Sequence, residues 1–128
     1  MQFPDGVGGA EPIARYLLEN SKYSSAEMRV KYSAFMPAPD NILSVFRVAG
    51  MEHAGITELG NDFVAAPQAR NLKGYAIVAA QIISDRGLDI VPTLEPHPRH
   101  ADVVGWSEKD ANRSRAQIIA EYARLVLA

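Results

Sequence analysis

The chain has 128 residues, 48% of them hydrophobic and 22% charged, which predicts one domain with a proper core. A formal net charge of −2 without a basic run argues against nucleic-acid binding. The lack of cysteine excludes disulfides, thiolate catalysis and cysteine zinc sites. No apolar run approaches the roughly 20 residues of a membrane helix, and the first residues lack a signal-peptide pattern. We therefore expect a cytoplasmic protein that does not associate with membranes.

The N-terminal region divides into an expected arm and an expected helix. Residues 1–9 are rich in glycine and offer little to bury, which predicts a flexible arm before a domain at residues 10–128. Over residues 11–20, Pro12 suits a first helical turn. Four apolar residues of this segment have the spacing of one helix face: Ile13, Tyr16, Leu17 and Leu18. The pattern therefore predicts a helix.

The middle of the chain carries the clearest strand pattern, at residues 41–48. There Arg47 alternates in phase with Leu43 and Val45, so it would lie on an apolar face. A buried guanidinium needs a partner, and we expect Asp102 or an acid on another element to supply one. Further elements are predicted in chain order: a helix at 52–63, a strand at 74–80, a helical turn ending at Gly87 and a short strand at 88–91.

The most unusual stretch is residues 97–106, His-Pro-Arg-His-Ala-Asp-Val-Val-Gly-Trp. Prolines hold the preceding chain extended, and a strand is predicted from His100 onward. Alternation would then place His100, Asp102, Val104 and Trp106 on one face. A carboxylate near an imidazole can raise its pKa and orient it. The structural alternative is that His100 is a hydrogen-bonded core histidine and Trp106 a core residue.

A last helix is predicted after Ser107, reaching Ala128. Ser107 and Asp110 have the spacing of a capping box, and an apolar stripe runs through Ile118, Ile119, Tyr122, Leu125 and Val126. This stripe would be core or the face of a homodimer. The whole pattern predicts an α+β fold: a small single domain with a short mixed sheet, packed helices and a C-terminal amphipathic helix.

Five residues are candidates for chemistry: His97, Arg99, His100, Arg47 and Asp102. The two arginines and two histidines together would suit a phosphate, with a histidine as acid or base. This would fit an RNA-cleaving enzyme or a nucleotide-using transferase. An arginine on an early strand and a later polar strand also loosely resemble ADP-ribosyltransferase folds, although a late catalytic glutamate is lacking.

Two other kinds of site are less well supported. His97 and His100 could ligate a metal with Asp102, but Pro98 prevents the one-turn helical geometry usual for paired histidines. A triad through Ser44 would place the nucleophile on a strand rather than on a sharp turn. We therefore predict no metal and no cofactor.

The chain resembles a group of small uncharacterised bacterial proteins for which no activity is established. The likeness spans roughly residues 12–127 and depends on these segments: Arg29-Val30-Lys31, Ala34-Phe35, Pro37, Ser44-Val45-Phe46-Arg47, Gly87-Leu88 and Pro96 to Trp106. The resemblance implies a stand-alone bacterial protein and carries no chemistry with it.

The leading expectation is a bacterial accessory or interaction protein that has no catalytic activity of its own and works with another protein. The alternative is an enzyme that acts on a phosphate-bearing substrate through His97, Arg99, His100 and Arg47.

Overall fold

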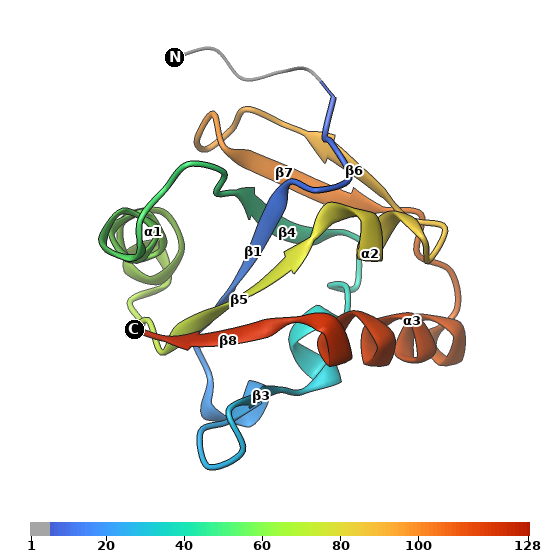
Figure 1. The fold of residues 1–128 in the computed structure, drawn as a ribbon, viewed down its shortest axis with the longest axis horizontal. Coiled ribbons are helices and arrows are strands. Elements are labelled where there is room, and N and C mark those ends of the chain that lie inside the picture. Colours follow the sequence, from blue (N-terminus) through green and yellow to red (C-terminus); the bar gives the residue numbers. More distant parts are fainter. Residues whose placement is uncertain (1–5) are drawn as a thin grey trace.

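A six-stranded sheet forms the centre of the computed structural model, which describes residues 6–128 (Figure 1). The strand order is β6-β7-β4-β1-β5-β8, and all neighbouring strands are antiparallel. The strands are β1 (Pro12–Leu17), β4 (Leu43–Arg47), β5 (Gly74–Ala79), β6 (Asp89–Pro92), β7 (His100–Val104) and β8 (Arg124–Leu127). A separate small hairpin joins β2 (Tyr23–Ser24) to β3 (Arg29–Val30).

Helices pack on both faces of this sheet. The α-helices are α1 (His53–Gly60), α2 (Ala80–Ser84) and α3 (Lys109–Tyr122). A π-helical turn, η3 (Asn61–Ala65), and a 3-10 turn, η4 (Ala66–Gln68), continue α1, while η1 (Asn20–Lys22) and η2 (Tyr32–Phe35) are further 3-10 turns. Helices combined with an antiparallel sheet confirm the predicted α+β class.

The two faces of the sheet bury two separate cores. The α3-side core includes Ile13, Leu17, Val45, Val78, Val103 and Ile119. The α1-side core includes Ala14, Tyr16, Phe46, Tyr75, Ile56 and Leu59. Figure 1 shows α1 and α3 on opposite sides of the sheet. Central strands such as β1 therefore need apolar residues on both faces.

The helix expected at residues 11–20 is wrong, because this segment is strand β1. It pairs with β5 over six residues, from Pro12 to Leu17. Ile13 and Leu17 enter the α3-side core, whereas Ala14 and Tyr16 enter the α1-side core. Apolar residues on both faces of a strand also satisfy helical spacing, so the local pattern did not distinguish the two structures.

The terminal helix is shorter than expected, because α3 ends at Tyr122 and the chain returns to the sheet as β8. Ile119 and Leu125 are buried as predicted, but Ile118 is only partly buried and Tyr122 is 64% exposed. The predicted capping box is also wrong: the Ser107 backbone N–H donates to the side-chain oxygen of Asn112.

The remaining predicted elements agree more closely with the structure. Strands β4, β5 and β6, helix α1 and the turn at Gly87, where φ is +78°, lie where the patterns indicated. Strand β7 begins at His100 as expected. Trp106 is a core residue, but it lies in the α3-side core rather than beside His100, because the chain turns at Gly105 with φ at +101°.

The N-terminal segment contacts the domain where it is described. Val7 packs on the α3-side core, and the carbonyl of Gly6 accepts a hydrogen bond from Arg47. The carbonyl of Gly9 accepts another from the N–H of Gln81. Residues 6–9 of the expected arm are therefore attached to the domain, and residues 1–5 lie outside the described part. Within residues 6–128, no helix has the length and apolar character needed to cross a membrane.

The sheet opens between β1 and β4. These strands share only two paired positions, Ile13 with Arg47 and Ala14 with Phe46. Beyond that point they separate, and the side chain of Arg15 bridges the gap by donating to the carbonyl of Ser44 at 3.0 Å.

Candidate functional site

Arg47 is buried and paired, as its position on the apolar face of β4 predicted. Only 2% of its side chain is exposed, and its partner is Glu11 rather than Asp102. The guanidinium binds both carboxylate oxygens, with Nε 2.5 Å from Oε2 and Nη2 2.8 Å from Oε1. The hydrogen bonds to Glu11 raise the pKa of Arg47, and their effect exceeds the opposite effect of burial. This bidentate pair anchors the segment before β1 onto the end of β4.

Arg99 and His97 fasten the connection between β6 and β7. Nη1 of Arg99 donates to the carbonyls of Arg47 and Ala49, at 2.9 and 3.1 Å. The N–H of Arg99 donates to Nδ1 of His97 at 3.1 Å, and the His97 ring meets Phe63 edge-on. Burial, with a smaller effect of the nearby Arg99 charge, lowers the pKa of His97. These contacts hold the proline-rich loop against the sheet.

His100 and Asp102 share one face of β7, as predicted. His100 Nε2 lies 4.0 Å from Asp102 Oδ1, and Nδ1 forms a hydrogen bond with the hydroxyl of Thr93. The imidazole also packs edge-on against Phe46, with ring centroids 5.1 Å apart. Burial lowers the pKa of His100 against the opposing effect of Asp102. The structure therefore places His100 as a hydrogen-bonded, partly buried histidine.

The side chains of the five candidate residues lie on both faces of the sheet. Arg47 directs its side chain to the face opposite that of His100, since it alternates in phase with Leu43 and Val45. Their side chains make the contacts described above, and none of the five lines the pocket described next. Among residues 6–128, no group of three or more histidine, aspartate or glutamate side chains is arranged to hold a metal ion.

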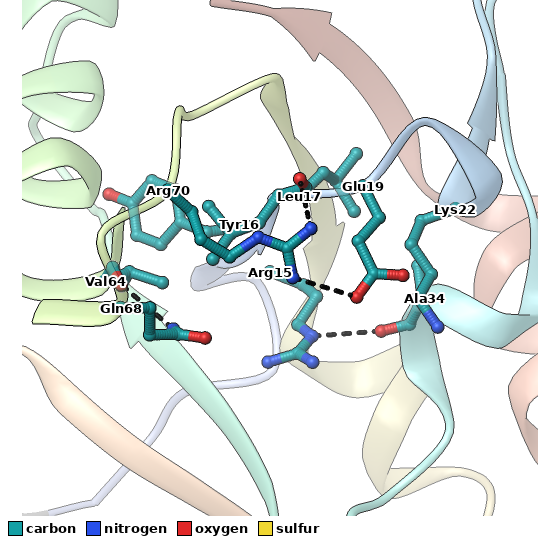
Figure 2. A pocket seen from close by; sticks show the side chains of 10 residues that line it. Arg15, Tyr16, Leu17, Glu19, Lys22, Ala34, Val64, Gln68 and Arg70 are labelled. Atoms are coloured by element: carbon teal, nitrogen blue, oxygen red, sulfur yellow. Dashed lines mark hydrogen bonds and ion pairs between the residues drawn. The ribbon is translucent and has the colours of Figure 1, made fainter. Parts of the chain in front are cut away.

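A small polar pocket of about 130 Å³ lies beside the end of β1 (Figure 2). Its wall comes from the end of β1 and the residues after it, from η1 and η2, and from the segment after α1. The lining residues are Arg15, Tyr16, Leu17, Leu18, Glu19, Lys22, Ala34, Val64, Gln68 and Arg70. Three cationic side chains and one carboxylate thus surround a space large enough for a small anionic group.

Arg15 is the unusual member of this pocket. Its Nε donates to the carbonyl of Ala34 and its Nη1 to that of Ser44, both at 3.0 Å. Within the described chain, no carboxylate oxygen lies within 4.0 Å of its guanidinium. Burial lowers the pKa of Arg15, although a guanidinium stays charged in proteins. A partly buried cation with neutral partners only is stabilised by an incoming anion.

Arg70, Glu19 and Lys22 surround the remainder of the pocket (Figure 2). Arg70 donates to the Glu19 carboxylate at 3.2 Å and to the Leu18 carbonyl at 3.3 Å. The Lys22 ammonium has one long contact, 3.5 Å to the carbonyl of Ser33. The hydrogen bond from Arg70 and the charge of Lys22 lower the pKa of Glu19. The pocket is therefore rich in donors and carries one carboxylate, at its exposed side.

This pocket was not predicted from the sequence. Arg15 lies between Ile13 and Leu17 on one face of β1, the same signal that indicated burial of Arg47. Because residues 11–20 were assigned to a helix, that signal was missed. Arg70 and Lys22 are ordinary surface cations in sequence, and only the fold brings them to Arg15. Comparisons with protein-family models, with curated proteins and with solved structures found no match for this chain.

Proposed function

We propose that this protein is a non-catalytic binding protein that recognises an anionic group of another molecule in the pocket of Arg15, Lys22 and Arg70. The observation that carries the proposal is the guanidinium of Arg15, which lines the pocket and has carbonyl partners only in the described chain. An anion placed there would satisfy donors that are already oriented.

The lining of the pocket favours binding over chemistry. Glu19 is its one carboxylate, and Arg70 and Lys22 lower its pKa, which makes it a weak general base at neutral pH. The Tyr16 hydroxyl is directed elsewhere, to the carbonyl of Ile56 at 2.6 Å, and burial raises its pKa. No histidine or serine lines the pocket.

This proposal develops the expectation of an accessory or interaction protein. A protein partner, a homodimer, the resemblance to small bacterial proteins and a cytoplasmic location stay predictions. The contacts of the His97 loop do not favour the alternative, an enzyme that handles a phosphate. Its Arg99 and His100 side chains bind groups of their own chain.

Titration with simple anions tests the proposal. Acetate and inorganic phosphate are added separately to 15N-labelled protein at constant ionic strength, and the Nε–Hε signal of Arg15 is followed by NMR. At least one anion should shift this signal saturably. Arg15→Gln should weaken the binding about tenfold to a hundredfold, since hydrogen bonds to charged groups contribute about 1.5–3 kcal/mol.

Two further variants keep the result interpretable. Lys22→Gln removes a charge from the pocket and only one long contact, the one with the carbonyl of Ser33. It therefore tests the site even if Arg15→Gln folds poorly. Lys31→Gln removes a nearby exposed cation that does not line the pocket, and it should leave binding unchanged. The proposal would be refuted if neither anion produced a saturable shift at Arg15. It would also be refuted if all three variants bound the anion as tightly as the unmodified protein.

A further inference from the structure

We infer that the anionic group recognised by this pocket is a phosphate monoester in its dianionic form. The inference rests on the proposed function, because it identifies the ligand of the same site. It depends on three features of the pocket: its net charge, the donors that its own chain leaves unused, and the depth at which its charges lie.

The charge of the pocket matches a dianion. Three cations, Arg15, Lys22 and Arg70, face one carboxylate, Glu19, which gives a net charge of +2. A phosphate monoester carries about −1.5 to −2 at pH 7, so it would bring the pocket close to neutrality. A carboxylate would leave one cation without balancing charge in a partly enclosed space.

The donors of the pocket match three acceptor oxygens better than two. Arg15 uses Nε and Nη1 for carbonyls, while its Nη2 donates to no group of the described chain. The Lys22 ammonium has three N–H donors, and one of them makes a long contact with the carbonyl of Ser33. A phosphoryl group presents three terminal oxygens to these donors, whereas a carboxylate presents two.

The charges are also ordered by depth. Arg15 and Lys22 are partly buried, whereas Glu19 and Arg70 are exposed, with 45% and 43% of their side chains accessible. A phosphoryl group would therefore lie against Arg15 and Lys22, with the ester oxygen directed outward. Glu19 would then stand beside the substituent, where its carboxylate can accept a hydrogen bond from a hydroxyl or N–H of the ligand.

The size of the pocket supports this placement. A volume of about 130 Å³ is about ten times the roughly 10–15 Å³ that a cavity needs to hold one water molecule, so the pocket has room for a phosphoryl group. The rest of the ligand would lie on the surface outside, near Glu19 and Arg70.

Calorimetric titration with matched tetrahedral probes tests the inference. Methyl phosphate is a dianion at pH 8 and largely a monoanion at pH 5, because its second pKa is about 6. Methyl sulfate has the same shape and stays a monoanion throughout. At pH 8, methyl phosphate should bind at least about tenfold more tightly than methyl sulfate or acetate, and this preference should vanish at pH 5.

The outcomes separate the inference from the proposed function. Equal binding of methyl phosphate and methyl sulfate at pH 8, or tightest binding of acetate, would overturn the dianion and leave anion binding intact. Failure of all three probes to bind would overturn both. Glu19→Gln should tighten methyl phosphate binding by removing a repelling charge, and unchanged or weaker binding would contradict the assigned position of Glu19.

The source of the phosphate forms the last arm of the experiment. A phosphoserine peptide and a nucleoside 5′-monophosphate are compared with methyl phosphate on the complete protein. Tighter binding of one identifies the kind of molecule that carries the group and supports the inference. Weaker binding of both than of methyl phosphate would contradict an open mouth that admits a substituent.

Discussion

Arg47 and Glu11 form a bidentate ion pair that joins the segment before β1 to the end of β4. Only 2% of the Arg47 side chain and 13% of the Glu11 side chain are exposed. Arg47→Ala would remove the two hydrogen bonds that the guanidinium donates to Glu11 in a nearly dry environment. Breaking a buried pair in this way costs about 3–5 kcal/mol, so the midpoint of a denaturant titration should fall clearly.

Two variants check this explanation. Arg29→Ala removes an exposed arginine with 67% of its side chain accessible, and it should change stability by no more than about 0.5 kcal/mol. Arg47→Met combined with Glu11→Leu removes both charges and should recover much of the lost stability. A double variant as unstable as Arg47→Ala would show that the pair is not the cause.

Ile119 anchors α3 on the sheet, with 1% of its surface exposed in the α3-side core. Ile119→Ala should lower the free energy of unfolding by about 2–5 kcal/mol, because it removes buried carbon and leaves a cavity. Tyr122→Ala, on the exposed end of the same helix, should cost much less. Equal losses in denaturant titrations would contradict this orientation of α3, as would a dimer that Ile119→Ala dissociates into folded monomers.

Gly60 allows α1 to approach Tyr16 closely. A Cβ at residue 60 would lie 2.4 Å from Cε1 of the Tyr16 ring, which Phe46 and Tyr75 hold on other sides. Gly60→Ala should therefore destabilise the protein by about 1–3 kcal/mol through overpacking. Melting temperatures and denaturant midpoints measure this loss.

Gly55 is the matched control in the same helix. Its added Cβ would meet only the end of the flexible Met51 side chain, at 3.4 Å. Gly55→Ala should stabilise the protein by about 0.5–1 kcal/mol, since alanine favours a helix over glycine. If both alanine variants changed stability in the same direction, the contact between Gly60 and Tyr16 would not explain the result.

His97 and His100 should make the fold less stable in mild acid. Burial lowers the pKa of both imidazoles in the folded protein; the charge of Arg99 also lowers that of His97, while Asp102 opposes the shift at His100. Below about pH 6.5 the imidazoles bind protons more readily in the unfolded chain than in the folded protein. The free energy of unfolding therefore decreases as the pH is lowered.

The experiment is a series of denaturant titrations between pH 7.5 and 5. The double variant His97→Gln with His100→Gln should show a shallower loss of stability than the original protein over this range. Parallel curves for the two proteins would rule out these imidazoles as the cause.

Several elements could be predicted from the sequence because their local pattern favours one structure over the others. In β4 the alternation of Leu43, Val45 and Arg47 indicated a strand, and it correctly predicted that Arg47 is buried with an acid. His100 and Asp102 were likewise placed on one face of β7. The glycine at position 87 ended the turn after α2, because its φ of +78° suits glycine.

The tertiary structure decided whether the segments of β1 and β8 are strands or helices. Their apolar residues fit both a helix stripe and a strand buried on two faces, so the spacing alone left the choice undetermined. Pairing with β5 resolved it for both, through backbone hydrogen bonds between residues 47 to 67 positions apart. Such partners are invisible to a local pattern.

The same long-range pairing created the candidate site. Arg15 lines the pocket from β1 and Lys22 from the turn that follows, while Ala34 and Arg70 come from segments further along the chain. The sequence by itself determined which residues could be buried and which strands alternate. The tertiary structure alone decided which charges meet, because the distance between side chains depends on strand order and register rather than on spacing along the chain.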